Sequence, residues 1–187
     1  LGIGFTDNNV KIGNTALDSL TAGNQNVAVG SNALTANTSA HDNTAVGHES
    51  LTTNTTGAQN TGLGHRSLQL NTTGSQNTAV GRHSLNANTT ADNNTGVGYH
   101  ALLSNTTGTN NTALGSLALD ANTTASHNTA IGNQSLGANT TGEANTALGQ
   151  GTLSSNTTAS NNTAIGRQSL NQNTTGSDVT AVGAYAL

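Results

Sequence analysis

The sequence has no cysteine, proline, methionine or tryptophan, and it has only two tyrosines and one phenylalanine. Without cysteine, neither disulfides nor thiolate metal sites can form. Only 6% of the residues are charged, and four Lys and Arg residues are too few for the basic face of a nucleic-acid-binding protein. There is no signal peptide and no apolar run long enough to span a bilayer. We therefore expect no nucleic-acid partner and no membrane insertion by this segment.

Asparagine and threonine are abundant instead, contributing 63 of the 187 residues, and they recur with a fixed period of 17 residues. Counting Asn9 as position 1, units follow one another without insertion or deletion. We divide the chain into an irregular initial segment, ten full repeats and a partial eleventh repeat, at 1–8, 9–178 and 179–187. Because methionine is absent and the last unit is incomplete, we expect a fragment or a processed product, with more coils or another domain after it.

The repeats are most informative when they are compared position by position. Position 5 is Gly and position 9 is Leu in all eleven units, and position 4 is always Val, Ile or Leu. Position 3 is Ala or Gly apart from Lys11, and positions 1 and 12 are almost always Asn. Helical repeats need longer periods, and coiled coils need heptads. The pattern predicts an all-β protein, a parallel β-solenoid (β-roll) with one coil per repeat.

The alternation of side chains along a strand divides each coil into two faces. Thr44 and Val46 share one face, and Ala45 lies on the other. We expect the aliphatic residues at positions 4 and 9 to form the core, and the small residues at position 3 to pack against a neighbouring chain. In the central coils the predicted core consists of Val46, Leu51, Leu63, Leu68, Val80, Leu85, Val97 and Leu102.

The invariant polar and glycine positions predict ladders and corners. In-register coils place identical Asn amides ~4.8 Å apart, within hydrogen-bonding reach of each other. A glycine at every position 5 indicates a positive φ angle or the close approach of another backbone. The expected ladder and corner residues are Asn43, Gly47, Asn54, Asn60, Gly64, Asn71, Asn77, Gly81 and Asn88. Eleven such coils would form a rod roughly 50 Å long.

These repeats resemble those of three families. The segment NTAVG at 77–81, followed by Ser84 and Leu85, resembles the head repeats of trimeric autotransporter adhesins, and it is similar to repeats of phage tail-fibre-like proteins. This resemblance covers 9–187 and implies a trimeric β-roll with an adhesive or shaft role. The segment GSQNTA at 74–79 is similar to the core of curli repeats, which implies a functional amyloid of an extracellular matrix.

Four histidines are the candidates for a metal site. His48 and His65 occupy position 6 in adjacent units, and His83 and His100 occupy position 7 in the next two. Stacking would set each pair ~5 Å apart, within reach of one metal ion. The alternative is that variable, exposed corner positions happen to hold histidine. We favour that alternative and expect neither a metal nor a cofactor.

The polar residues raise three further possibilities, which are an enzymatic site, ice binding and N-glycosylation. The acidic residues lie mostly at variable positions and no fixed pair recurs, so we expect no enzyme. Rows of Thr at positions 13 and 14 leave ice binding as an alternative. Nine units carry Asn-Thr-Thr or Asn-Thr-Ser, formally N-glycosylation acceptors, as at Asn54, Asn71 and Asn88. Turns and ladders explain these motifs without a sugar.

Taken together, the residues and the resemblances favour an extracellular or cell-surface structural protein, the solenoid of an adhesin or fibre shaft. Self-association into a trimer or filament is expected. The variable positions 6 and 7 would contact a partner such as a host surface or glycan. A curli-like amyloid subunit and an ice-binding solenoid are the alternatives.

Overall fold

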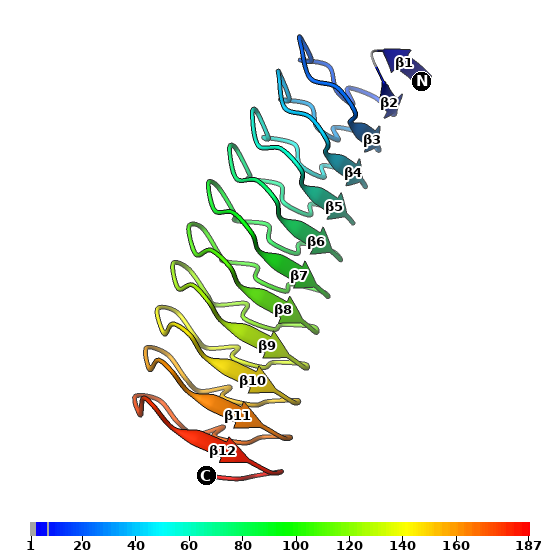
Figure 1. The fold of residues 1–187 in the computed structure, drawn as a ribbon. Coiled ribbons are helices and arrows are strands. Elements are labelled where there is room, and N and C mark those ends of the chain that lie inside the picture. Colours follow the sequence, from blue (N-terminus) through cyan, green and yellow to red (C-terminus); the bar gives the residue numbers. More distant parts are fainter. Residues whose placement is uncertain (1–2, 7) are drawn as a thin grey trace.

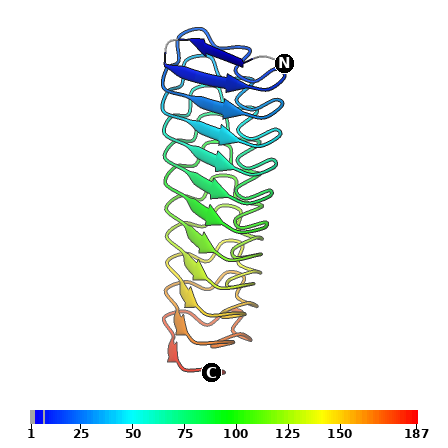
Figure 2. The same ribbon diagram turned by 90° about the vertical axis from the view of Figure 1, so that its right-hand side faces the viewer.

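The computed structural model describes residues 3–6 and 8–187 and confirms the predicted all-β parallel solenoid. Its coils stack into one narrow column, with the two termini at opposite ends (Figure 1). Figure 2 shows the short strands of successive coils lying beside one another along the column. The parallel strands, one per repeat, are β2 (Asn9–Ile12), β3 (Val27–Val29), β4 (Thr44–Val46), β5 (Thr61–Leu63), β6 (Thr78–Val80), β7 (Thr95–Val97), β8 (Thr112–Leu114), β9 (Thr129–Ile131), β10 (Thr146–Leu148), β11 (Thr163–Ile165) and β12 (Thr180–Val182).

Every parallel pair keeps the register of the repeat. In β4 and β5, for example, Thr44 lies opposite Thr61 and Val46 lies opposite Leu63. The first strand differs, since β1 (Ile3–Thr6) pairs antiparallel with β2. Part of the initial segment that we expected to be irregular is therefore a regular strand, and it covers the edge of the first coil.

The longer, non-strand part of each coil also bonds to the next coil through its backbone. The amide of Leu51 donates to Ser67 O at 3.0 Å, and the amide of Thr55 donates to Thr72 O at 2.9 Å. Backbone polar groups that would be unsatisfied in an isolated turn are thus paired between coils. Hydrogen bonding around much of the coil explains how strands of only three residues can form a stable stack.

The corner at position 5 requires glycine for both of the predicted reasons. Gly47 has a φ of 137°, and a Cβ atom built on it would lie 2.5 Å from Gly64 O of the next coil. Non-glycine residues also adopt positive φ at positions 7, 9 and 17, as at Glu49 (57°), Leu51 (52°) and Gln59 (60°). Each coil therefore turns at four left-handed positions, and only the first of them excludes every side chain.

The core differs from the prediction at one face of the strand. The leucines at position 9 lie in the core as expected, and Leu51, Leu68, Leu85 and Leu102 are fully buried. The residues at position 4 point outward, so the assignment of Val46, Leu63, Val80 and Val97 to the core was wrong: Leu63 is 45% exposed and the three valines are half-buried. The residues at position 3 are inside instead, and Ala45 and Ala79 are 0% exposed.

The physical reason for this inversion is the width of the coil. Asn43 at position 1 is fully buried, and Ala45, two residues further along the strand, must share its face. The Asn side chains and the leucine at position 9 fill the interior opposite the strand, where Ala or Ser at position 8 is also buried. Space for only a methyl group or a hydrogen remains at position 3. No neighbouring chain is needed to keep that position small.

Both predicted Asn ladders are present. At position 1, the backbone amide of Asn60 donates to Asn43 Oδ1 at 2.9 Å. At position 12, Asn71 Nδ2 donates to Asn54 Oδ1 at 2.8 Å, and Asn88 Nδ2 donates to Asn71 Oδ1 at 2.8 Å. These side chains are fully buried. The amides of the formal N-glycosylation motifs are therefore occupied by bonds inside the coil.

Candidate functional site: a corner row of histidine and arginine

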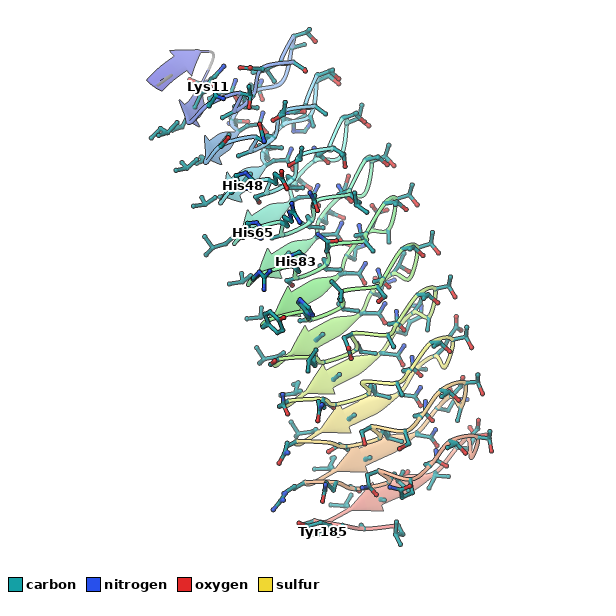
Figure 3. All side chains as sticks on the ribbon, turned by 180° about the vertical axis from the view of Figure 1, so that it is seen from behind. Lys11, His48, His65, His83 and Tyr185 are labelled. Carbon is teal, nitrogen blue, oxygen red and sulfur yellow. The ribbon has the colours of Figure 1, made fainter. Side chains whose placement is uncertain are left out.

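Positions 6 and 7 follow the corner glycine, and in the third to sixth repeats they carry four of the six histidines and two of the four Lys and Arg residues of the chain. We call the side chains of this strip, which runs along one corner of the column, the corner row. It consists of His48, Glu49, His65, Arg66, Arg82, His83, Tyr99 and His100. Figure 3 shows His48, His65 and His83 one below another on the same side of the column.

The four histidines form one continuous row and not two separate pairs. The ring centroids of His48 and His65 are 5.4 Å apart, with the rings nearly parallel. His65 lies 5.3 Å from His83, and His83 lies 5.4 Å from His100. The change from position 6 to position 7 between the fourth and fifth repeats therefore does not interrupt the row. Sequence spacing predicted the two outer contacts but not the central one.

Arg66, Arg82 and Tyr99 belong to the same strip, although the sequence analysis did not single them out. Arg66 Nε donates to Glu49 Oε2 at 2.6 Å, so each of these charges compensates the other. The guanidinium of Arg82 lies 5.9 Å from the centre of the Tyr99 ring, and Tyr99 stacks on His100 at 3.8 Å. The signal that could have found them was their location at the two variable corner positions.

The environment of the row disfavours extra positive charge. Partial burial, with Arg66 and His48 nearby, lowers the pKa of His65 below its ordinary value of 6.5. Burial and the adjacent Arg82 and His100 lower the pKa of His83 in the same direction. The hydrogen bond from Arg66 lowers the pKa of the Glu49 carboxyl. The row therefore disfavours protonation of His65 and His83, and beside them it holds one Arg–Glu pair and Arg82.

The described part of the chain holds no group of three or more His, Asp or Glu side chains placed to bind one metal ion. The candidates His48, His65, His83 and His100 meet as neighbouring rings in a line. His65 Nδ1 is buried and has no hydrogen-bond partner within residues 3–6 and 8–187. Chemically, the row presents a line of imidazole rings, which can bind protons, beside two guanidinium groups.

A second surface is the outward side of the sheet, formed by positions 2 and 4, which we call the outer sheet face. It carries a row of Thr, with Val in the first two repeats, beside a row of Val, Ile or Leu. No charged residue occurs at either position. The larger aliphatic side chains of this face are between 37% and 46% exposed at Ile12, Leu63, Leu114, Leu148 and Ile165.

An open pocket of about 400 Å³ lies where Gly137 replaces the larger residues found at position 10 in other coils. Asp120 lies at its wall, and partial burial raises the pKa of that carboxyl. The pocket is lined by Leu117, Asp120, Gln134, Gly137, Ala138 and Ser154.

Comparisons with protein-family models, with curated proteins and with solved structures find no match to this chain. Among residues 3–6 and 8–187, no helix has the length and apolar character needed to cross a membrane. Arguments about function therefore depend on the two surfaces described above.

Proposed function

We propose that this chain is the rod of an extracellular fibre or surface adhesin, and that copies of it associate side by side through the outer sheet face. The observation that carries the proposal is the uninterrupted outward-facing aliphatic row at position 4, whose members are half-buried or exposed. Large apolar patches on soluble proteins usually mark interaction surfaces. Here the patch recurs in every coil and follows the column from end to end.

The chemistry of the outer sheet face suits a second copy of the same face. Neither position 2 nor position 4 holds a charge, so two such faces would meet without charge repulsion or desolvation of ions. Thr hydroxyls beside the aliphatic row retain hydrogen-bonding capacity at the rim of such a contact. The low charge of the whole chain, 6% of its residues, also suits a surface that is covered on assembly.

The available area sets the strength of the contact. A stack of eleven strands spaced ~4.8 Å apart, each about 10 Å long, presents about 500 Å². Two copies would then bury about 1,000 Å² in total, the lower limit for a specific interface. The association should therefore need nearly the full length of the rod, and charges placed within the face should abolish it.

The test is the oligomeric state by light scattering and sedimentation. The parent chain is expected to form a discrete oligomer, whereas Leu63→Lys combined with Leu114→Lys should be monomeric. Leu70→Lys combined with Leu103→Lys adds the same charges to the same residue type away from the outer sheet face, and it should keep the parental state. A monomeric parent, or equal dissociation of both double variants, would refute the proposal. Circular dichroism establishes that each variant is folded.

Ice binding is a second candidate, and one observation favours it. The Thr and aliphatic rows of the outer sheet face form a regular two-wide array, with identical neighbours such as Thr44 and Thr61 in register. Such an array presents hydroxyls and methyls at constant spacing. Thermal hysteresis or faceted ice crystals in solutions of the monomeric chain would support ice binding, and ordinary freezing would exclude it.

A curli-like fibril is the weaker alternative. Fibril growth uses unpaired strand edges as templates, and the antiparallel β1 covers the edge of β2, so the edge of β12 is the one parallel strand edge that the described sheet leaves for growth. Thioflavin-binding fibres that lengthen without limit would favour amyloid over a discrete oligomer. The same light-scattering experiment separates the two outcomes.

A further inference from the structure

We propose that the corner row is a pH-gated binding site for an extended anionic polysaccharide, one that carries sulfate or carboxylate groups, and that it engages this ligand when its histidines are protonated. The choice of a polysaccharide over other polyanions rests on the extracellular placement in the proposed function. The site itself lies on a different surface from the outer sheet face.

The distribution of charge along the chain is the first argument. Two of the four Lys and Arg residues and four of the six histidines lie in the corner row. Positions 6 and 7 of the other coils hold mostly uncharged side chains, such as Ser31 and Asn32 or Asn133 and Gln134. The chain has a formal net charge of −4 with neutral histidine. Protonating six histidines adds six positive charges, which makes the chain net cationic, with the charge concentrated in this strip.

The second argument is the set of groups that face the imidazoles. Glu49 is paired with Arg66, lies 3.9 Å from His48 Nε2 and also acts on His65. Asp120, in the coil after that of His100, is influenced by His100. The remaining neighbours of the row are the cations Arg66 and Arg82, the Tyr99 ring, and neutral amides such as Gln69, which donates to Glu49 at 2.9 Å. No carboxylate in the described region bonds to His65 or His83. The carboxylate that acts on His65 is Glu49, which is already paired with Arg66, and none acts on His83, so an external anion would supply the counter-ion that the protonated row lacks.

The geometry favours a polymer over a small anion. Adjacent rings are 5.3–5.4 Å apart, so the row repeats one cationic group per coil over four coils. A single sulfate or phosphate can bridge at most two neighbouring positions, whereas a linear polyanion can meet all of them. Several weak contacts on one chain multiply into a useful affinity. Tyr99, exposed and stacked on His100, adds an apolar ring face of the kind that sugars contact.

Binding and protonation are linked. Close cations and burial disfavour protonation of His65 and His83 in the free protein, and a bound polyanion reverses the sign of that effect. The ligand should therefore bind weakly at pH 7.4 and much more tightly at pH 5. The same linkage predicts that the ligand raises the melting temperature at pH 5 and has little effect on it at pH 7.4.

The test uses dextran sulfate as the probe, neutral dextran as the blank, and single-stranded DNA of similar charge as the competing polyanion. Binding to the full chain is measured by fluorescence anisotropy at pH 5 and pH 7.4, at constant ionic strength. The row variant combines His48→Ser, His65→Ser, His83→Asn and His100→Asn. Ser and Asn already occupy positions 6 and 7 in other coils, so this variant is expected to fold.

The matched control is His41→Ser combined with His127→Asn, which removes two exposed histidines outside the row and again uses residues found at those positions in other coils. The parent and the control should bind dextran sulfate at least tenfold more tightly at pH 5 than at pH 7.4, and the row variant should lose that gain. Equal binding by parent and row variant at pH 5, or no change with pH, would overturn the proposal. DNA binding as tight as dextran sulfate would overturn the assignment to polysaccharide. The monomeric Leu63→Lys, Leu114→Lys variant should still bind, which separates this site from self-association.

Discussion

Asn71 Nδ2 donates at once to Asn54 Oδ1 of the preceding coil and to Gly74 O of its own coil, both at 2.8 Å. The same Gly74 O accepts a bond from Asn60 Nδ2, also at 2.8 Å. The two Asn ladders therefore converge on one carbonyl per coil, at position 15. Each coil is held shut by these bonds, and the Asn-to-Asn bonds tie it to its neighbour.

Replacing a ladder residue in the middle of the column should be strongly destabilising. Asn88→Ala removes the bonds to Asn71 and Ala91; Ala91 O keeps the bond from Asn77, but the buried Asn71 Oδ1 loses its donor, and we expect the change to cost about 2–3 kcal/mol. Denaturant unfolding followed by circular dichroism measures the change. Asn133→Ser, at an exposed position 6, is the control and should change stability by less than about 0.5 kcal/mol. Similar losses in the two variants would contradict the ladder's role.

Two substitutions in one repeat test which face of the strand lies in the core. Leu102→Ala should cost about 2–5 kcal/mol because it leaves a cavity in the core. Val97→Thr, on the outer sheet face of the same repeat, should stay within about 0.5 kcal/mol when it is measured on monomeric protein. If Val97→Thr proved as damaging as Leu102→Ala, position 4 would be core after all.

The left-handed position 7 offers a stabilising substitution. Gln134 has a φ of 57°, and Gly151 occupies the same position in the next repeat with a φ of 65°. Gln134→Gly should raise stability by roughly 0.5–1 kcal/mol, since the relief of left-handed strain exceeds the entropy that glycine loses. The reverse change, Gly151→Ala, should lower stability by about 1 kcal/mol. Melting temperatures that move in the same direction for both variants would show that φ does not control this position.

The histidine row should make the column less stable in acid when no ligand is bound. The pKa values of His65 and His83 are lowered in the folded state, so the unfolded chain binds more protons below about pH 6.5. The contribution of these two histidines to the free energy of unfolding is therefore fully present above about pH 6.5. It is lost as the pH falls from there through their lowered pKa values in the folded state. Melting curves at pH 7.5, 6 and 5 should show this loss.

Glu49 also makes the folded protein less stable as the pH falls, but in a more acidic range, because Arg66 lowers the pKa of the Glu49 carboxyl in the folded state. Its stabilisation is present above the ordinary carboxyl pKa and disappears as pH falls through the folded value. The variant that combines His65→Ser and His83→Asn should flatten the curve between pH 7.5 and 5 while leaving the more acidic Glu49 effect. A double variant that retained the full parental loss between pH 7.5 and 5 would show that other groups cause it.

The sequence predicted the coil, its period, both ladders, the glycine corner and the leucine at position 9, because each depends on a residue that recurs. It did not predict which strand face is buried. The prediction placed Val46 in the core and Ala45 against a neighbouring chain, whereas the buried Asn43 determines the face through alternation. A strand whose Asn is already inside has no space there for a larger neighbour than Ala45.

The corner row was only partly predictable for a related reason. His48 and His65 share a position, so simple stacking brings them together. His65 and His83 occupy different positions, and their contact depends on side-chain directions at a left-handed corner. Spacing within the sequence does not contain that information. Arg82 and Tyr99 share position 6 in adjacent repeats, so simple stacking would have predicted their contact, but only the histidines were considered as candidates there.

Because successive coils pair in the same register, the number of coils can change without a change in fold. The parallel strand pairs and the Asn-to-Asn ladder bonds join residues 17 apart, so the loss or duplication of seventeen codons would remove or add one whole coil. Every remaining bond would find an equivalent partner, and the rod would change length by ~4.8 Å. Unequal recombination could thus adjust the reach of the molecule in single-coil steps without disturbing its fold, whereas an insertion of any other length would break the stack.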